Sequence, residues 1–237
     1  MTRTAYITGG SKGIGLGIAK ALLRNGIHVA ITARTQSDLD LAEQQLKAIG
    51  KGEVLIIQSD VRNLANEESA VQQIIDKWGR LDYCIANAGV GKFSPIDEMS
   101  AEDWNLVVDV NLTGVFHTVK AAIPALKESK GYIITISSLA GTNFFEQGAA
   151  YNASKFGVVG FSQAIMLDLR RYDIKVTTIM PGSVATNFAG HAVTEKEAWK
   201  IQPEDIGQIV ADLVQMNPRT LPSKIEVRPA VPPSARK

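Results

Sequence analysis

Cysteine, charge imbalance and long apolar runs are all scarce in this 237-residue sequence. Its one cysteine, Cys84, excludes an intrachain disulfide, and its place in the apolar run 83–86 favours a buried strand residue in a reducing, cytoplasmic setting. The 25 basic residues nearly balance the 24 acidic ones, and no Lys/Arg run stands out. The charge footprint of a nucleic-acid-binding protein is therefore missing, and we expect a small-molecule partner instead.

Targeting and metal-binding patterns are missing as well. A strand-and-turn motif begins within the first ten residues, which leaves no room for a signal peptide, and no apolar stretch approaches the length of a membrane span. His28, His117 and His191 are far apart in the sequence and form no ligand-spaced pair. We expect a soluble, cytoplasmic protein with no membrane partner and no metal.

The sequence does have a regular alternation of short apolar runs and longer segments with helical periodicity. Runs that are apolar at nearly every residue are typical of strands buried on both faces, as in a parallel sheet between helices. We therefore predict an α/β fold, a doubly wound Rossmann-type fold with a seven-stranded parallel sheet, in a single domain over residues 1–237. The predicted strands are 4–8, 28–32, 54–58, 83–86, 132–136, 176–180 and 224–227, and the longer helical segments include 16–24, 64–78, 115–126, 151–172 and 204–216.

A glycine-rich turn joins the first predicted strand to the helix that follows. Glycine permits a positive φ and a close approach to a pyrophosphate, while a helix N-terminus offers unpaired N–H groups and a partial positive charge. The spacing is G-x-x-x-G-x-G instead of the usual G-x-G-x-x-G, and a glycine cluster alone can be an ordinary turn. Because a strand precedes it and a helix follows, we predict dinucleotide binding by Gly9, Ser11, Lys12, Gly13, Ile14 and Gly15.

Tyr151 and Lys155 begin a long predicted helix at spacing i, i+4 and therefore share a face. A lysine charge roughly 4 Å from a phenol contributes about 4 kcal/mol at an effective dielectric near 20, or about 3 pKa units. Such a shift would bring the tyrosine pKa near neutrality, as a general acid requires. The pair also occurs by chance as two solvated residues, so its context matters: Ser137 and Ser138 end the strand 132–136, at the sheet edge where such folds bind ligands.

Taken together, these motifs resemble the short-chain dehydrogenase/reductase family in its compact single-domain form, over residues 6–227. The resemblance implies an oxidoreductase that transfers a hydride between NADP(H) and a small carbonyl or secondary alcohol compound. It implies that Tyr151 donates or accepts the proton, and that Lys155 lowers the tyrosine pKa and holds the nicotinamide ribose. Ser138 would hydrogen-bond the substrate oxygen, and Asn111 would hold a water in a proton relay to the lysine.

The resemblance also extends to the remainder of the cofactor site and to the substrate. Residues at about 187–202 are expected to read the substrate, and their apolar members, with Phe93, Phe144 and Phe145, hint at a partly apolar carbonyl compound. The further cofactor contacts that it implies are Asp60 and Val61 beside the adenine, Asn87, Ala88 and Gly89 after the fourth strand, and Pro181, Gly182, Val184 and Thr186 near the nicotinamide amide.

Charge at the end of the second strand favours NADP(H) over NAD(H). An NAD site has an acidic residue about 20 residues after the glycine turn, whereas this chain has Ala33 followed by Arg34. The guanidinium of Arg34 can meet a 2′-phosphate, and Lys12 could approach the same group from the other side. The first acidic residue, Asp38, comes after the turn and is not expected to repel the phosphate.

The resemblance does not decide the assembly or the substrate. The C-terminal segment 225–229 differs from the Val-Asp-Gly-Gly end of many relatives that reduce acyl-carrier-bound ketones, so that substrate is not assigned. Apolar residues on the predicted helices 115–126 and 156–169 favour a homodimer or homotetramer. The Pro-rich tail at about 229–237 is expected to be loosely ordered.

The sequence has features that bear on two functions other than that of an oxidoreductase. The segment 160–164 faintly resembles the nucleophile elbow of a serine hydrolase, but Ser162 lies inside a continuous helical pattern with no strand before it. A non-catalytic dinucleotide sensor on the same fold is expected to lose a catalytic side chain, and all four are present. The oxidoreductase interpretation is therefore preferred.

Overall fold

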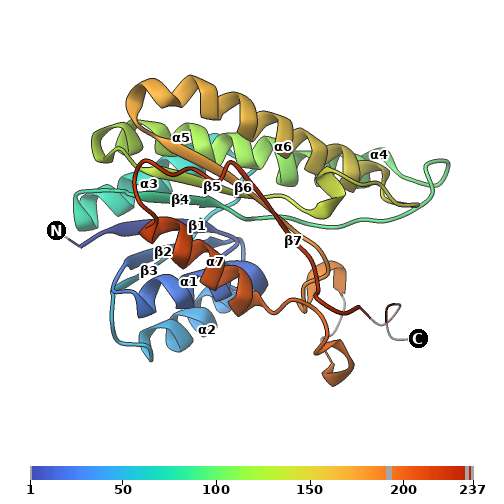
Figure 1. Ribbon diagram of the computed structural model, residues 1–237, viewed down its shortest axis with the longest axis horizontal. Coiled ribbons are helices and arrows are strands. Elements are labelled where there is room, and N and C mark those ends of the chain that lie inside the picture. Colours follow the sequence, from blue (N-terminus) through green and yellow to red (C-terminus); the bar gives the residue numbers. More distant parts are fainter. Residues whose placement is uncertain (1, 191–193, 233–234, 236–237) are drawn as a thin grey trace.

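A computed structural model describes residues 2–190, 194–232 and 235 of the chain (Figure 1). In this described part, seven parallel strands form one sheet in the order β3-β2-β1-β4-β5-β6-β7. The strand order reverses between β1 and β4, which confirms the predicted doubly wound α/β fold. The strands are β1 (Thr4–Thr8), β2 (His28–Ala33), β3 (Val54–Gln58), β4 (Tyr83–Ala86), β5 (Tyr132–Ile136), β6 (Lys175–Pro181) and β7 (Lys224–Val227).

Helices cover both faces of this sheet (Figure 1). Helices α1, α2 and α7 lie on one face, and α3, α5 and α6 lie on the other. Helix α4 continues into α5 through a π-helical turn, η1 (Asp109–Thr113). The helices are α1 (Gly13–Arg24), α2 (Gln36–Lys47), α3 (Leu64–Trp78), α4 (Ala101–Val108), α5 (Gly114–Ser129), α6 (Ala149–Leu169) and α7 (Pro203–Gln215).

Successive side chains of β1 point into two different cores because the side-chain direction of a strand alternates. Ala5 and Ile7 pack on the side of α1 and α7, whereas Tyr6 packs on the side of α3 and α5. All three are fully buried. This burial on both faces explains why the middle of β1 is apolar and has no polar alternation.

The core beneath α3 contains one buried carboxylate, that of Glu67. Its oxygens accept hydrogen bonds from the hydroxyl groups of Tyr6 (2.8 Å), Ser59 (2.7 Å) and Thr118 (2.8 Å). A buried charge is tolerated only when it is hydrogen-bonded in this way. Glu67 thereby connects α3 to β1, to the loop after β3 and to α5.

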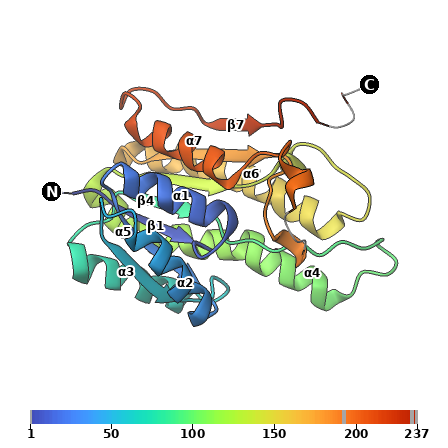
Figure 2. The same ribbon diagram turned by 90° about the horizontal axis from the view of Figure 1, so that it is seen from below.

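Helices α1 and α7 lie side by side and cross at two glycines (Figure 2). A Cβ atom on Gly17 would lie 2.4 Å from the carbonyl oxygen of Pro203, and one on Gly207 would lie 2.5 Å from that of Gly17. Any larger side chain at either position would force the helices apart. This contact fixes α1, and with it the glycine turn, against the far end of the chain.

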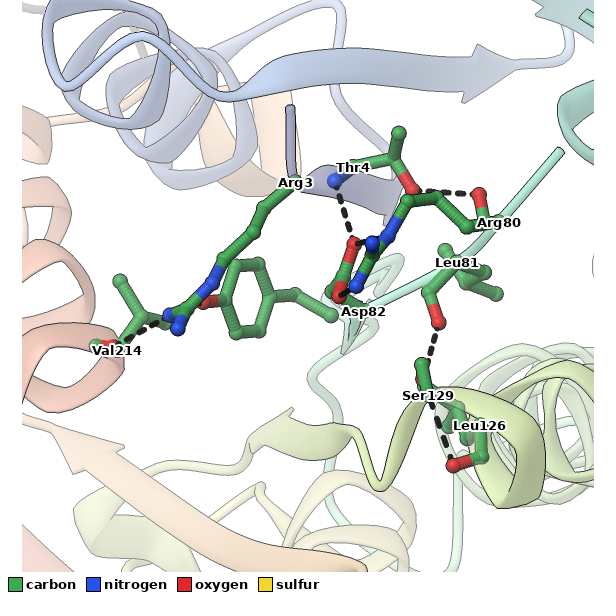
Figure 3. Close-up of polar contacts among 9 residues, drawn as sticks. Arg3, Thr4, Arg80, Leu81, Asp82, Leu126, Ser129 and Val214 are labelled. Atoms are coloured by element: carbon green, nitrogen blue, oxygen red, sulfur yellow. Dashed lines mark hydrogen bonds and ion pairs between the residues drawn. The ribbon is translucent and has the colours of Figure 1, made fainter. Parts of the chain in front are cut away.

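The amino edge of the sheet is held by a polar network (Figure 3). The carboxylate of Asp82 accepts hydrogen bonds from the backbone N–H of Thr4 (2.8 Å) and from Nε of Arg80 (2.9 Å). The hydroxyl of Thr4 donates to the carbonyl of Arg80 (2.6 Å). The network thus joins the starts of β1 and β4. Further contacts drawn are those of Arg3 with Val214, and of Ser129 with Leu81 and Leu126.

One helical segment departs from the expectation that no stretch approaches the length of a membrane span. Residues Ala101–Ser129, which combine α4, η1 and α5, are long and apolar enough to cross a membrane. Half of their most apolar window is buried inside the fold, however, as is common for a core helix. The segment is therefore weak evidence for a membrane span.

Candidate active site

A cavity of about 590 Å³ opens at the carboxyl edge of the sheet. The glycine turn and the loops after β4, β5 and β6 surround it, because the carboxyl ends of parallel strands meet at one edge. Most of the residues predicted from the sequence line it: Gly9, Lys12, Gly13, Ile14, Asn87, Ala88, Gly89, Ser138, Tyr151, Lys155, Pro181, Gly182, Val184 and Thr186.

Other predicted residues lie outside the cavity lining, and some lining residues were not predicted. Ser11, Gly15, Arg34, Asp60, Val61 and Asn111 are not part of the lining formed by the described residues. Ile136, Ser137 and Ser183 line the cavity without a role having been predicted for them, although Ser137 was noted at the end of its strand. Asn187 and Lys200 also line it and fall within the expected substrate segment at about 187–202, although nothing local distinguishes Lys200.

The glycine turn has the geometry that its residue types require. Gly9 and Gly13 have φ angles of +63° and +51°, a region that side chains rarely adopt. A Cβ atom on Gly15 would lie 2.3 Å from the carbonyl oxygen of Gly9. The amide of Asn87 donates to the carbonyls of Thr8 (2.8 Å) and Gly9 (3.2 Å) and so fixes the turn to the β4 loop. The backbone at this turn is therefore open to a close-lying ligand.

The N-terminus of α1 points its first N–H groups toward this turn. Among the described residues, no side chain caps it, and its first turn contains no acidic residue. Unpaired N–H groups with a partial positive charge favour an anion such as a phosphate. The cradle of Gly9, Gly13 and Gly15 together with this helix end fits the pyrophosphate of a dinucleotide.

Lys12, one of the two expected phosphate contacts, is paired within the protein. Its ammonium lies 2.7 Å from the carboxylate of Asp38. The sequence analysis did not predict this pair, although it noted Asp38 as the first acidic residue after the turn. Helix α2 begins at Gln36, directly after β2, and this brings its first turn against the glycine turn. The other expected contact, Arg34, is exposed at the end of β2.

The expected adenine pair lies next to Arg34. A hydrogen bond from Arg62, opposed in part by burial, lowers the pKa of Asp60, and the charge of Arg34 contributes to the same shift. Arg62 Nε lies 3.0 Å from each carboxylate oxygen of Asp60. Val61 is buried, and its carbonyl oxygen lies 2.9 Å from Nδ1 of His117. This end of the site combines an acidic group with two guanidinium groups.

Tyr151, Lys155 and Ser138 converge where α6 passes the end of β5. The ammonium of Lys155 is buried, donates to the carbonyl oxygen of Ile136 (3.0 Å) and lies 5.6 Å from the centre of the Tyr151 ring. Burial lowers the pKa of Lys155 to about 8. The hydroxyl of Ser138 accepts from the N–H of Ala140 (3.1 Å), which holds the serine at the rim.

The tyrosine pKa differs from the sequence-based expectation. Burial raises the pKa of Tyr151, and a hydrogen bond with Ser138 opposes that rise in part. The expected depression of this pKa by Lys155 was wrong for this arrangement, because burial outweighs the groups that lower it, and the ammonium is engaged with the carbonyl of Ile136. Tyr151 is therefore protonated at neutral pH, in the state of a proton donor.

Asn111 lies in the π-helical turn and is fully buried. Its side-chain oxygen accepts from the N–H of Val90 (2.8 Å), and its amide nitrogen donates to the carbonyl of Val90 (2.9 Å) and to Ser154 (3.2 Å). A Cβ atom on Gly89 would lie 3.4 Å from the Asn111 oxygen and 3.7 Å from Lys155 Nζ, so both flank this glycine. Asn111 thus braces the β4 loop beside the lysine.

Three phenylalanines surround the Tyr151 ring. Its centre lies 5.5 Å from that of Phe93, 5.7 Å from that of Phe188 and 6.5 Å from that of Phe145. We call Phe93, Phe145 and Phe188 the aromatic collar. Phe144, which the sequence grouped with them, is 87% exposed and points away from the fold.

The serine-hydrolase and histidine-site alternatives find no support in the described residues. Ser162 is fully buried inside α6, and its hydroxyl lies 2.8 Å from that of Thr135. His28 stacks on Trp78 at 5.3 Å between ring centres, far along the chain from the site loops. His191 lies outside the described residues.

The expected substrate segment at about 187–202 is described in part. It contains the short 3₁₀ turns η4 (Phe188–Gly190) and η5 (Glu195–Glu197), and Ile201 forms a β-bridge with Val184. The bridge brings the end of the segment back to the β6 loop. Residues 191–193 of this segment, and 233–234 and 236–237 of the tail, lie outside the described residues.

The chain is similar to known proteins along most of its length. A family model described as short chain dehydrogenase matches residues 3–197. Sepiapterin reductase of Chlorobaculum tepidum is 30% identical over 237 residues, which cover 97% of each chain. An alcohol dehydrogenase structure from the archaeon Thermococcus sibiricus, complexed with 5-hydroxy-NADP, is 27% identical, with a TM-score of 0.92 and 97% of both chains covered. A metagenomic short-chain oxidoreductase structure in complex with NADP is 33% identical, with a TM-score of 0.85 and coverage of 97% of this chain and 98% of that one.

Proposed function

Because the chain belongs to the short-chain dehydrogenase family, we propose that it reduces a small carbonyl compound with NADPH, or catalyses the reverse reaction. The observation that carries this proposal is the convergence of Ser138, Tyr151 and Lys155 on one cavity that continues to the glycine turn. One end of this cavity suits a dinucleotide phosphate. The other end offers a protonated phenol beside a buried lysine.

The cofactor residues present fit a nicotinamide dinucleotide. The turn from Gly9 to Gly15 and the N-terminus of α1 would hold its pyrophosphate, Asn87 to Gly89 would line its middle, and Pro181 to Thr186 would meet its nicotinamide end. When bound, NADPH supplies the hydride that reduces the carbonyl carbon.

The protein's own residues would manage the proton. Ser138 would hold the carbonyl oxygen by a hydrogen bond, and the Tyr151 phenol would donate its proton to the developing alkoxide. Lys155 would support this step through its positive charge near the tyrosine ring. Asn111 would keep the β4 loop in register beside Lys155 through its bonds to Val90. A protonated Tyr151 favours reduction as the direction for which the site is prepared.

A panel of ketones, aldehydes and diketones tests the proposal. Purified protein should consume NADPH with at least one class, in proportion to the alcohol formed. The Tyr151→Phe protein is the matched inactive control, and its expected behaviour is developed in the Discussion. No consumption with any carbonyl, together with tight binding of NADPH, would favour a non-catalytic sensor instead.

We predict a preference for NADPH over NADH that Asp38 moderates. Charge-assisted hydrogen bonds from Arg34 and Lys12 would contribute roughly 1.5 to 3 kcal/mol each, but Lys12 must exchange Asp38 for the phosphate. We expect a preference in kcat/KM on the order of tenfold to a hundredfold. Ala33→Asp combined with Arg34→Ile should reverse it, and Asp38→Asn should increase it. Equal use of both cofactors by the native protein would contradict the prediction.

We also propose that the protein forms a homo-oligomer through the surface of α4, α5 and α6. The apolar residues expected on these helices fall into a buried and an exposed group. Val115 and Val119 are buried in the core, whereas Phe116 and Phe156 are 44% and 45% exposed. Trp104 on α4 adds to this exposed set. Such a patch is usually covered by a partner. Light scattering at micromolar concentration should give a multiple of 25.5 kDa, and a value near the monomer mass would refute the proposal.

A further inference from the structure

The aromatic collar gives the mouth of the active site an unusual chemical character. Phe93 and Phe188 line the cavity, and Phe93 also packs on Phe145 at 5.9 Å between ring centres. All three collar rings are between 37% and 49% exposed. Large apolar side chains that remain this exposed around a cavity are typical of a binding surface for an apolar ligand.

The absence of a side chain at Gly91 leaves room for two of the collar rings. A Cβ atom on Gly91 would lie 2.6 Å from Phe188 and 2.9 Å from Phe93, so both rings approach the space that any larger residue would occupy. The Phe93 and Phe188 rings both meet Tyr151 edge-on, at interplanar angles of 65° and 61°. Edge-to-face contacts of this kind are favourable for flat rings, and an aromatic ligand can make the same contacts.

The charged groups in the cavity are already engaged within the protein. In the described part of the chain, the lysines that line it are Lys12, Lys155 and Lys200, which contact Asp38, the Ile136 carbonyl and Glu197, respectively. No acidic residue belongs to the described lining. An ammonium on the substrate would therefore lose its hydration without gaining a carboxylate, and a carboxylate could pair with one of these lysines only by displacing its present partner.

We infer that the substrate is an uncharged aryl carbonyl compound, whose flat ring packs against the exposed collar rings at the mouth of the cavity. This inference rests on the proposed function, because it concerns the same site. The carbonyl oxygen would lie at Ser138 and Tyr151, and the aryl group would extend outward along Phe93 and Phe188. The carbonyl oxygen would take the proton of Tyr151, leaving a phenolate that solvent reprotonates, and the carbonyl carbon would take the hydride that NADPH supplies when bound, which gives CH–OH and NADP⁺.

Matched diketones test the substrate class. 1-Phenyl-1,2-propanedione and 2,3-butanedione share the reacting unit and differ in an aryl group, while benzoylformate and its methyl ester differ in charge. We expect kcat/KM with NADPH to be at least tenfold higher for the phenyl dione than for the methyl one, and higher for the ester than for the acid. Equal or inverted ratios, with NADPH consumed, would overturn the inference but leave the proposed function intact.

Collar variants separate ring recognition from general apolar burial. Phe93→Leu and Phe188→Leu keep apolar side chains and should each reduce the phenyl-to-methyl ratio roughly threefold to tenfold, mainly through KM. Phe144→Leu is the matched control and should leave the ratio unchanged, because Phe144 is 87% exposed. An unchanged ratio in both collar variants would overturn the inference.

Binding measurements keep the inference testable if no carbonyl is turned over. Titration calorimetry of 1-phenyl-1,2-propanedione into NADPH-saturated native protein should give binding that Phe93→Leu weakens and Phe144→Leu does not. Such binding without turnover would reject the proposed function and support the collar. Absence of binding would reject the collar as a substrate site.

Discussion

Replacement of Tyr151 by Phe should lower kcat for carbonyl reduction by about 10² to 10⁴-fold, the usual contribution of a general acid. The substitution removes the phenol oxygen and keeps the ring, so the contacts with Phe93 and Phe188 remain. The hydrogen bond from Ser138 is made to the removed oxygen only. The remainder of the cavity should therefore be unchanged. Steady-state NADPH consumption with the best carbonyl of the panel measures the effect.

NADPH binding by the Tyr151→Phe protein is the necessary control. Quenching of tryptophan fluorescence should give a dissociation constant for NADPH within about threefold of that of the native protein. A tenfold change would correspond to about 1.4 kcal/mol of binding free energy. Retained turnover would remove Tyr151 from the proton-donor role. Weak NADPH binding with a lowered melting temperature would instead indicate misfolding.

Replacement of Lys155 by Met should abolish most activity and at the same time stabilise the fold near neutral pH. The pKa of Lys155 is lowered from its ordinary value of 10.5 to about 8 by burial, so the folded protein binds this proton more weakly than the unfolded chain does. The resulting destabilisation is complete below about pH 8 and disappears as the pH rises toward 10.5. A shift of this size corresponds to roughly 3 kcal/mol, offset in part by the lost hydrogen bond to Ile136.

Urea unfolding of the cofactor-free proteins at pH 7 and pH 10 tests this prediction. The Lys155→Met protein should be more stable than the native one by about 1 to 2 kcal/mol at pH 7, and the difference should shrink at pH 10. Lys51→Met, a change of an exposed lysine in the loop between α2 and β3, is the matched control and should alter neither stability nor activity. A less stable Lys155→Met protein at pH 7 would show that the ammonium contributes net stability.

The sheet and its order of elements could be predicted because burial on both faces leaves a direct signal in the sequence. The five strands at 4–8, 54–58, 83–86, 132–136 and 224–227 have the predicted bounds, while β2 and β6 are longer by one and two residues. These extensions are Ala33, Lys175 and Pro181, residue types that are depleted in strands, although the strand pairing continues through them. The turn η1 has no such signal, because a π-helical turn is rare, replaces a single turn inside a longer helical segment and is not marked by any residue type.

The site was predictable where it depends on one motif and unpredictable where it depends on contacts between distant segments. Gly9, Ser138, Tyr151 and Lys155 each lie at a recognisable spacing from a strand. The pairing of Lys12 with Asp38 depends on how closely α2 follows β2, and the direction of the Lys155 ammonium depends on the free carbonyl of Ile136. Neither can be inferred from spacing alone, and the tyrosine pKa was therefore misjudged.

The polar network at the amino edge of the sheet lies far from the residues that would select the substrate. Thr4, Arg80 and Asp82 hold the starts of β1 and β4. The collar lies beyond the other end of the sheet, and a strand of about five residues puts roughly 15 Å between the two. Substitutions that far apart, with no shared partner, usually have additive effects on stability. Phe93 and Phe188 can therefore be exchanged for other side chains without loss of the stability that the amino-edge network provides, so selection on the substrate and selection on stability act at opposite edges of one sheet.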